Sequence, residues 1–303
     1  MAEIIAEIGQ AFDGSIGILH SMIDGAASAG AGIVKFQMHI AEAESSDLEP
    51  FRKKFSRVDK TRRDYWKRME LTDEQWRDVR DHCHDLNLEF LVTPFSKMAV
   101  EKLEALGVGR YKIGSGDISN EVILESIRRT GKNVIISTGL ANEMEIDRVV
   151  SLLGKDRVTI LHCTTSYPTT AEQVRLGEMD KIRKRFGVPV GLSDHSGTIF
   201  PCLAAVALGA SIVEAHVTFD KRMFGPDSKA SLTFEEFRQM VEGVRFLEAA
   251  LESSPEEKTD KEELRKIFGR SLAVNRDIKL GAGDTKTITP QPRDLALLNS
   301  CIR

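Results

Sequence analysis

Short apolar runs alternate with longer helix-like stretches along most of this sequence, and this alternation limits the folds that the chain can adopt. Apolar runs of this length, bounded by Gly, Pro or polar residues, are typical of buried strands. Eight of them, each followed by a predicted helix, span Ile4–Ile8, Gly32–Gln37, Phe90–Thr93, Arg110–Ile113, Val134–Ser137, Val158–His162, Val188–Leu192 and Ile212–His216. Eight such units predict an α/β protein whose parallel strands close into a (β/α)8 TIM barrel. An open doubly wound sheet is the alternative, because periodicity does not reveal closure.

The composition indicates an ordinary soluble protein. The chain has 303 residues, of which 41% are hydrophobic and 29% charged, and its formal net charge is −4. These values predict no surface for nucleic acid or membranes, and we expect no membrane span or signal peptide. The four cysteines form no Cys-x-x-Cys pair and no disulfide framework. A reducing cytoplasm is therefore the expected location.

Two histidines stand at the carboxyl ends of successive predicted strands. His195 closely follows the strand that ends at Leu192, and His216 ends the strand that begins at Ile212. Because side chains alternate along a strand, Glu214 shares a face with His216. Two strands that end in imidazoles could together bind one metal ion. The alternative is that each histidine is a hydrogen-bonded residue at the end of its strand.

Almost every other predicted strand also carries a polar side chain at its carboxyl end. These residues include Glu7, Lys35, Gln37, Thr93, Lys112, Ser115, Ser137, Thr138, His162, Thr164 and Ser193. In a TIM barrel such residues share one rim, which is the usual position of the active site. The two lysines need an anionic partner, since burial opposes an unpaired charge. With the Gly-Ser-Gly turn after the fourth strand, they indicate a phosphate site, although that turn alone is more simply a plain turn.

Other segments are interpreted from their composition. Residues 41–70 form a long, highly charged insertion, and its stretch Arg52–Arg68 predicts either a solvated surface or a lid over the barrel mouth. His39 closely follows the second strand, and the sequence indicates no partner for it. Cys163 lies near the predicted site, but no base to activate it is visible, so we interpret it as a small buried residue.

The strand-end segments resemble the N-acetylneuraminate (sialic acid) synthase family, including its legionaminate and pseudaminate synthase relatives. The matching segments occur in family order over about residues 2–250. They are Ala6-Glu7-Ile8-Gly9, Val34-Lys35-Phe36-Gln37, Thr93-Pro94-Phe95-Ser96, Tyr111-Lys112-Ile113-Gly114-Ser115-Gly116, Ser137-Thr138-Gly139, His162-Cys163-Thr164, Tyr167-Pro168-Thr169, Gly191-Leu192-Ser193-Asp194-His195 and Gly225-Pro226-Asp227.

The resemblance implies a transferase that condenses phosphoenolpyruvate with an N-acetylmannosamine-like (N-acyl hexosamine) aldehyde. The products would be a nine-carbon 2-keto-3-deoxy sugar acid and phosphate, released by C–O cleavage. A divalent metal ion is implied, with Mn²⁺ expected and Mg²⁺ or Co²⁺ as alternatives. By position, His195 and His216 correspond to the metal ligands, and Glu7 to a catalytic group that handles the proton of water. The implied substrate contacts are Lys35, Gln37, Thr93, Lys112, Ser115, Ser137, Tyr167, Ser193 and Asp227.

The resemblance also implies a domain organisation and a homodimer. We expect a catalytic barrel over residues 1–252, a linker over 253–267, and a partial antifreeze-protein-like (SAF) segment over 268–303. The stretch Arg270–Lys279 resembles the opening of that domain, whereas the residues after Pro290 depart from its pattern. In the family this domain lends an arginine to the partner subunit's sugar site, and no arginine here is assigned to that role. Thr165 stands where some sialic acid synthases carry Asn, which leaves one phosphoenolpyruvate contact unassigned.

Three other functions are weighed against this one. A class I aldolase would use Lys112 or Lys35 as a Schiff-base nucleophile, which leaves the two histidines unexplained. A related synthase acting on a phosphorylated aldose would need a second anion site, which the sequence does not indicate. A non-catalytic sugar-binding barrel would bind sugar without releasing phosphate.

Overall fold

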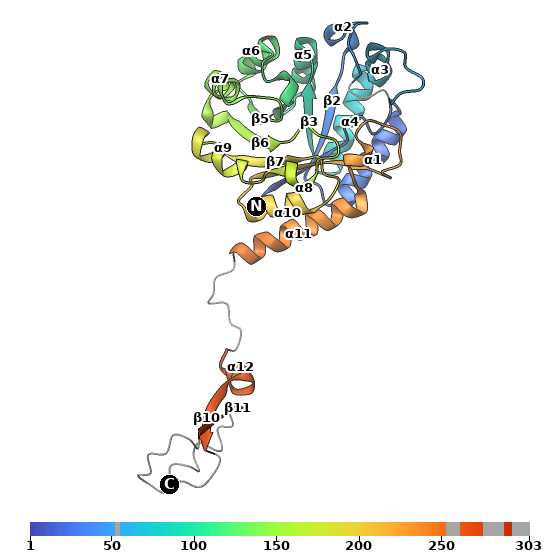
Figure 1. Cartoon of the computed structure of the whole chain (residues 1–303). Coiled ribbons are helices and arrows are strands. Elements are labelled where there is room, and N and C mark those ends of the chain that lie inside the picture. Colours follow the sequence, from blue (N-terminus) through green and yellow to red (C-terminus); the bar gives the residue numbers. More distant parts are fainter. Residues whose placement is uncertain (52–54, 253–260, 275–287, 293–303) are drawn as a thin grey trace. The chain divides into compact units, whose positions relative to one another are not determined.

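The computed structural model of the chain describes residues 1–51, 55–252, 261–274 and 288–292. The chain divides into two compact units, Met1–Leu251 and Glu252–Arg303. In the first unit, strands and helices alternate along the sequence, as the colours in Figure 1 show. The two units are described separately below.

Eight parallel strands of the first unit close into a barrel. They are β1 (Glu3–Glu7), β2 (Ile33–Met38), β3 (Glu89–Pro94), β4 (Arg110–Ile113), β5 (Asn133–Ser137), β6 (Val158–Cys163), β7 (Val190–Asp194) and β8 (Ile212–Thr218). Each strand pairs with the next, and β1 also pairs with β8, where Glu7 lies beside His216. This closing pair confirms the predicted (β/α)8 barrel and excludes the open doubly wound sheet. The short strand β9 (Leu232–Thr233) pairs with the end of β8.

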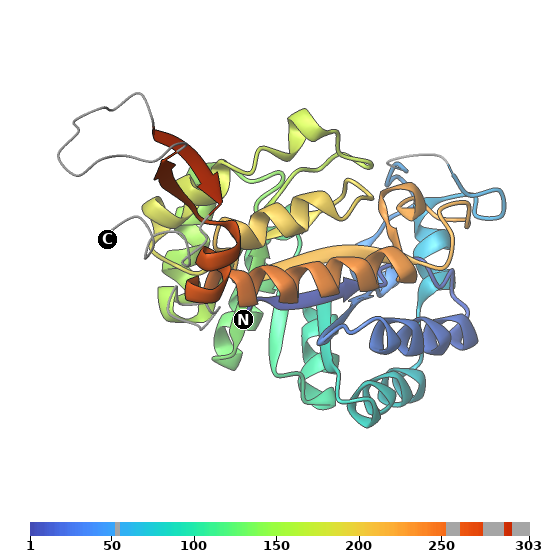
Figure 2. The same ribbon diagram turned by 90° about the horizontal axis from the view of Figure 1, so that it is seen from below.

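Helices surround the strands, as Figures 1 and 2 show from two directions. They are α1 (Ile16–Ser28), α2 (Ala41–Glu44), α3 (Arg62–Met69), α4 (Asp73–Asp85), α5 (Lys97–Leu106), α6 (Glu121–Thr130), α7 (Glu143–Leu153), α8 (Ala171–Val174), α9 (Glu178–Phe186), α10 (Phe200–Ala207) and α11 (Phe234–Glu252), with 3₁₀ turns η1 (Ser115–Asp117), η2 (Lys155–Arg157) and η3 (Ser228–Ala230). Thr72 and Gln75 form a capping box at the start of α4. None of the described helices combines the length and apolarity needed to cross a membrane.

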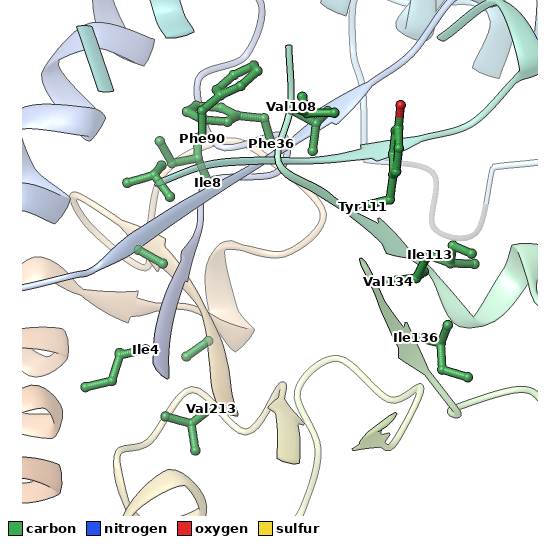
Figure 3. Close-up of a cluster of buried hydrophobic side chains, with 14 of the residues drawn as sticks. Ile4, Ile8, Phe36, Phe90, Val108, Tyr111, Ile113, Val134, Ile136 and Val213 are labelled. Atoms are coloured by element: carbon green, nitrogen blue, oxygen red, sulfur yellow. The ribbon is translucent and has the colours of Figure 1, made fainter. Parts of the chain in front are cut away.

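The apolar core has two parts because alternate strand residues face opposite sides of the sheet. The larger cluster lies between strands and helices; Figure 3 shows part of it, including Phe36 and Phe90, whose ring centroids are 5.3 Å apart. The smaller cluster consists of Ile5, Ile33, Leu91, Ile135, Leu161 and Ile212. These six strand residues alternate with the outward-facing set, so they form an apolar layer inside the barrel.

A polar layer follows the interior apolar layer along the strands, since residues two apart share a face. The residues two positions further on are Glu7, Lys35, Thr93, Ser137, Cys163 and Glu214, all buried. On β7 the apolar layer has a glycine instead of a side chain. A Cβ on Gly191 would lie 2.7 Å from Leu161 Cδ2 and would collide with the Ile212 carbonyl oxygen. The interior therefore has no room for a seventh apolar side chain at this position.

The second unit contains α12 (Lys261–Phe268) and a two-stranded antiparallel sheet of β10 (Arg270–Val274) and β11 (Ile288–Pro292). Residues 253–260, 275–287 and 293–303 lie outside the described residues. The predicted linker and SAF-like segment fall largely on these positions, so both remain predictions.

Candidate active site

Lys35 and Lys112 converge on one carboxylate oxygen at the carboxyl ends of the strands. The Nζ atom of each lysine lies 3.6 Å from Glu214 Oε1. Lys35 Nζ also lies 3.0 Å from Glu7 Oε2, and Lys112 Nζ donates a 2.7 Å hydrogen bond to Ser137 Oγ. All five residues are at most 4% exposed. The anionic partners that the lysines were predicted to need are therefore, within this chain, two glutamates.

The ionisation of this group follows from burial and from the opposing charges. Burial opposes the charge of Lys35, but Glu214 and Glu7 outweigh burial and hold its pKa above the ordinary value. Burial lowers the pKa of Lys112, and Glu214 offsets only part of that effect. Burial also disfavours the Glu214 carboxylate, yet Lys112 and Lys35 lower its pKa to about 2. Glu214 is thus ionised and serves as the internal counter-ion of both lysines.

The two predicted histidines lie together above the lysines. The ring centroids of His195 and His216 are 5.3 Å apart, and both side chains are buried. His195 Nδ1 lies 3.2 Å from the Thr164 carbonyl oxygen. Because a carbonyl only accepts, Nδ1 carries the proton and the Nε2 lone pair is left for a ligand. Burial lowers the pKa of His195 well below its ordinary value, so its imidazole is in the neutral form that metals bind.

These features fit a divalent metal ion held by two imidazoles. No group of three or more His, Cys, Asp or Glu residues suited to a metal occurs in the part of the chain that the structure describes. An ion here would therefore keep coordination positions for water or substrate oxygen, as catalytic metal sites do. Tyr167 borders the pair, with its ring centroid 4.2 Å from that of His195.

Glu7 connects Lys35 to Gln37. Gln37 Nε2 donates a 2.7 Å hydrogen bond to Glu7 Oε1. At Gly9, which has a φ of +52°, the backbone passes close to the Glu7 carboxylate and the His216 ring. A Cβ at this glycine would lie 3.2 Å from Glu7 Oε1 and 3.4 Å from His216 Cε1. Glycine at this position therefore leaves room for the Glu7 carboxylate and the His216 ring.

The remaining predicted residues surround this centre. Lys35 Nζ donates to Thr93 Oγ1 at 3.4 Å, and Ser193 Oγ donates to Glu214 Oε1 at 2.9 Å. Ser115 begins η1, and its Oγ lies 3.2 Å from the position that a Cβ would take on Gly139. Tyr167 and Asp227 line a cavity that also contains His216. The structure thus groups most of the predicted strand-end residues at one rim, with Thr138, His162 and Thr164 as exceptions. The hydroxyl of Thr138 donates to the Leu161 carbonyl at 3.5 Å, and that of Thr164 donates to the Gln173 carbonyl at 2.7 Å.

His162 lies outside the site although it stands near the end of a predicted strand. Its Nε2 atom is 2.8 Å from the Val174 carbonyl oxygen at the end of α8. It alternates with Leu161 and Cys163, which face the barrel interior, so its ring turns towards the helices. His162 is therefore a hydrogen-bonded strand-end histidine outside the site.

Two adjoining cavities lie at the barrel mouth on the side of Gln37. The smaller, of about 220 Å³, contains Tyr167, His216 and Asp227. The larger, of about 590 Å³, contains His39, Glu44 and other residues after β2, β3 and β4. The residues common to both linings are Gln10, Gln37, Arg62, Trp66 and Phe95. Arg62 and Trp66, from the charged stretch Arg52–Arg68, line both cavities. This agrees better with the prediction of a lid over the barrel mouth than with that of a solvated surface.

Sequence reasoning did not assign Glu214 to the site and found no partner for His39. The signal for Glu214 was its position two residues before His216. His39 Nδ1 lies 2.7 Å from Glu44 Oε1, within a contact that no spacing rule indicates. Cys163 agrees with its interpretation, because burial raises the pKa of its thiol to about 11. Cys83, Cys163 and Cys202 are free and buried, and Cys301 lies outside the described residues.

Comparisons with known proteins point to one family. The NeuB family model matches residues 22–256. The chain is 35% identical over 287 residues to N,N'-diacetyllegionaminic acid synthase of Campylobacter jejuni, covering 92% of this chain and 86% of that protein. It is 32% identical over 292 residues to N-acetylneuraminate-9-phosphate synthase of Mus musculus, covering 94% and 80%. The crystal structure of a sialic acid synthetase from Leptospira borgpetersenii, in complex with citrate, superposes with a TM-score of 0.74 at 29% identity, covering 89% of this chain and 93% of that one.

Proposed function

Since the chain belongs to the NeuB family and is therefore a synthase, we propose that it condenses phosphoenolpyruvate with an N-acyl hexosamine aldehyde to give a nine-carbon 2-keto-3-deoxy sugar acid and phosphate. The observation that carries this proposal is the convergence of Lys35 and Lys112 on Glu214. Two buried ammonium groups that share one internal carboxylate are suited to a dianionic or trianionic substrate, which can replace that carboxylate as their partner.

The serine and threonine hydroxyls complete the site for phosphoenolpyruvate. Ser137 and Thr93 already accept hydrogen bonds from the two lysines, and Ser193 donates to Glu214. Hydroxyls rotate, so each can turn its proton towards a phosphate or carboxylate oxygen when one arrives. The contacts of 3.6 Å between the lysines and Glu214 are longer than a normal hydrogen bond and are the ones that a bound anion would replace.

The proposed reaction forms a C–C bond and breaks a C–O bond. C3 of phosphoenolpyruvate attacks the aldehyde carbon, whose oxygen takes a proton and becomes a hydroxyl. Positive character then develops at C2, and water adds there while Glu7 takes its proton. The C2–O bond to phosphate breaks as the new C2 hydroxyl loses its proton, which leaves the 2-keto group. A divalent ion held by His195 and His216, with Mn²⁺ preferred, would polarise the aldehyde oxygen as a Lewis acid.

The test measures phosphate release from phosphoenolpyruvate with a panel of N-acyl hexosamines, with and without added Mn²⁺. With ¹⁸O in the bridging position, the label should appear in phosphate, because the C–O bond breaks. A covalent imine trapped by borohydride would instead establish the class I aldolase. Sugar binding without any phosphate release would establish the non-catalytic barrel.

We further propose a cytoplasmic homodimer in which the C-terminal segment of one chain caps the barrel of the other. The support is the resemblance of Arg270–Lys279 to the opening of the family's C-terminal domain. Mixing a His195→Ala chain with a chain lacking residues 253–303 should restore activity above that of the shortened chain alone. An active monomer whose activity mixing leaves unchanged would contradict the exchange.

A further inference from the structure

Of the two cavities at the barrel mouth, the smaller lies on the side where the sugar acceptor is proposed to bind, and it is small for a whole N-acyl sugar. Its volume of about 220 Å³ lies below the usual range for small-molecule sites, which begins at about 300 Å³. It contains His216 and Tyr167, so it is the part nearest the reacting aldehyde in the proposed reaction. The adjoining cavity of about 590 Å³ shares five lining residues with it and supplies the missing room. An acceptor placed with its aldehyde at His216 would extend into this larger cavity.

Glu44 lines the larger cavity and has one carboxylate oxygen without a hydrogen-bond partner within the described part of the chain. Its side chain is 8% exposed, and its Oε1 atom lies 2.7 Å from His39 Nδ1. Its Oε2 atom is buried and has no hydrogen-bond partner among the described residues. A buried carboxylate oxygen without a partner is unfavourable, because it has lost its hydrogen bonds to water. Because a carboxylate only accepts, the group that satisfies Oε2 must bring an O–H or N–H.

The surrounding rings hold this carboxylate in place. His39 is stacked between Trp66 and Phe95, with centroid distances of 3.7 and 4.2 Å and interplanar angles of 11° and 14°. Its Nε2 atom lies 3.2 Å from Gln37 Oε1, and Gln37 in turn donates to the catalytic candidate Glu7. A continuous series of contacts therefore runs from Glu44 to the reaction centre, and the aromatic rings fix its middle member.

The charges of the larger cavity favour a neutral group over an anion. Three carboxylates line it, those of Glu44, Glu49 and Asp117. Arg62 also lines it but is paired with Glu49 at 3.1 Å. Lys97 lines it as well but is paired with Glu101 at 3.6 Å. A phosphate in this cavity would face the unpaired oxygen of Glu44.

We infer that the larger cavity is a second acceptor subsite, which binds the non-reacting end of an unphosphorylated sugar through an O–H or N–H donated to Glu44 Oε2. This inference rests on the proposed function and specifies its substrate class. Trp66 and Phe95, shared by both cavities, provide an apolar surface for the carbon skeleton, as aromatic residues do in ligand sites.

The test compares the native protein with Glu44→Gln by calorimetric titration of the whole chain. Glutamine keeps the volume and an oxygen for His39, but it replaces the free acceptor with a donor. The Kd for N-acetylmannosamine should rise about tenfold, while the Kd for phosphoenolpyruvate changes less than twofold. Glu42→Gln, on the same helix but exposed and outside the cavity lining, is the matched control and should change neither Kd.

Analogues of the sugar identify the donor. One of the 4-, 5- and 6-deoxy analogues of N-acetylmannosamine should bind the native protein about tenfold more weakly than the parent, and should lose no further affinity in Glu44→Gln. N-acetylmannosamine 6-phosphate should bind the native protein more weakly than N-acetylmannosamine. In Glu44→Gln the ratio of the two Kd values should be smaller than in the native protein.

The outcomes separate the inference from the proposed function. Native phosphate release together with an unchanged sugar Kd in Glu44→Gln overturns the subsite alone. The subsite is also overturned if every deoxy analogue loses the same affinity, relative to N-acetylmannosamine, in the native protein and in Glu44→Gln. If the native protein binds no N-acyl hexosamine and releases no phosphate, the proposed function fails and the subsite fails with it. A misfolded Glu44→Gln would be recognised by a changed phosphoenolpyruvate Kd, and Glu44→Asp then replaces it, because a shorter carboxylate should retain part of the sugar affinity.

Discussion

Replacing Lys112 with methionine should weaken phosphoenolpyruvate binding selectively. The substitution keeps the length of the side chain but removes its charge and its 2.7 Å hydrogen bond to Ser137. In the proposed complex the ammonium group donates to an anion, and a hydrogen bond to a charged group contributes about 1.5–3 kcal/mol. The KM for phosphoenolpyruvate should therefore rise by about 10- to 150-fold. In this variant Glu214 Oε1 still has two partners, Lys35 Nζ at 3.6 Å and Ser193 Oγ at 2.9 Å. Because the buried carboxylate stays paired, the barrel should still fold.

The assay is phosphate release against phosphoenolpyruvate concentration at saturating sugar, repeated with the sugar varied. The KM for the sugar should change by less than about threefold, because other residues line the two acceptor-side cavities. Lys132→Met is the control: Lys132 makes a 2.6 Å ion pair with Glu104, but it precedes β5 and so lies at the opposite end of the barrel. An unchanged KM for phosphoenolpyruvate in Lys112→Met would refute the anion-binding role. Equal rises in both KM values would point to general damage instead.

Three further predictions concern the metal, the barrel interior and acid stability. His195→Ala and His216→Ala should each abolish tight binding of Mn²⁺ in calorimetric titrations, and full activity in a chelated sample would contradict the metal assignment. Gly191→Ala should lower the free energy of unfolding in urea by about 1–3 kcal/mol or prevent folding, because its Cβ meets the interior layer. The control Gly177→Ala, which meets no atom within 4 Å, should not destabilise the protein. Hydrogen bonds from Arg68 are the main cause that lowers the pKa of Asp59 below its ordinary value of 3.8. The stabilisation from this carboxylate is therefore fully present above pH 3.8 and is lost as the pH falls through the lowered pKa. Asp59→Asn should therefore destabilise by about 1 kcal/mol at pH 7, and the difference should shrink between pH 5 and pH 2.

The barrel and its rim could be predicted because both depend on strand periodicity. Alternation of side chains indicated that Glu214 and His216 share a face, and their strand pairs with the one that carries Glu7. The same rule, applied to strand ends alone, did not separate His162 from His195. Ser193 lies on β7 and His195 follows directly after that strand, two residues further on, and both face inward. His162, in contrast, is one residue from the inward-facing Leu161. Which face a strand-end residue occupies follows only once the register of the whole strand is known.

The acceptor side could not be predicted in the same way. His39, Glu44 and Trp66 come from three points along an irregular segment, and their contacts depend on how that segment folds over the barrel. No period of 2 or 3.6 residues relates them, and their charged neighbours read as solvated surface. The partner of a buried histidine in a loop is set by tertiary packing, which composition does not encode.

The six apolar side chains inside the barrel also affect the order in which molecules can come and go. They close the lower end of the interior, so a molecule held by Lys35 and Lys112 leaves through the rim at the carboxyl ends of the strands, where His216 and the acceptor-side cavities lie. A sugar bound over this rim would delay the departure of an anion held beneath it. Productive binding therefore needs phosphoenolpyruvate before the sugar. An unreactive sugar analogue that binds the free protein should block the entry of phosphoenolpyruvate and raise its apparent KM.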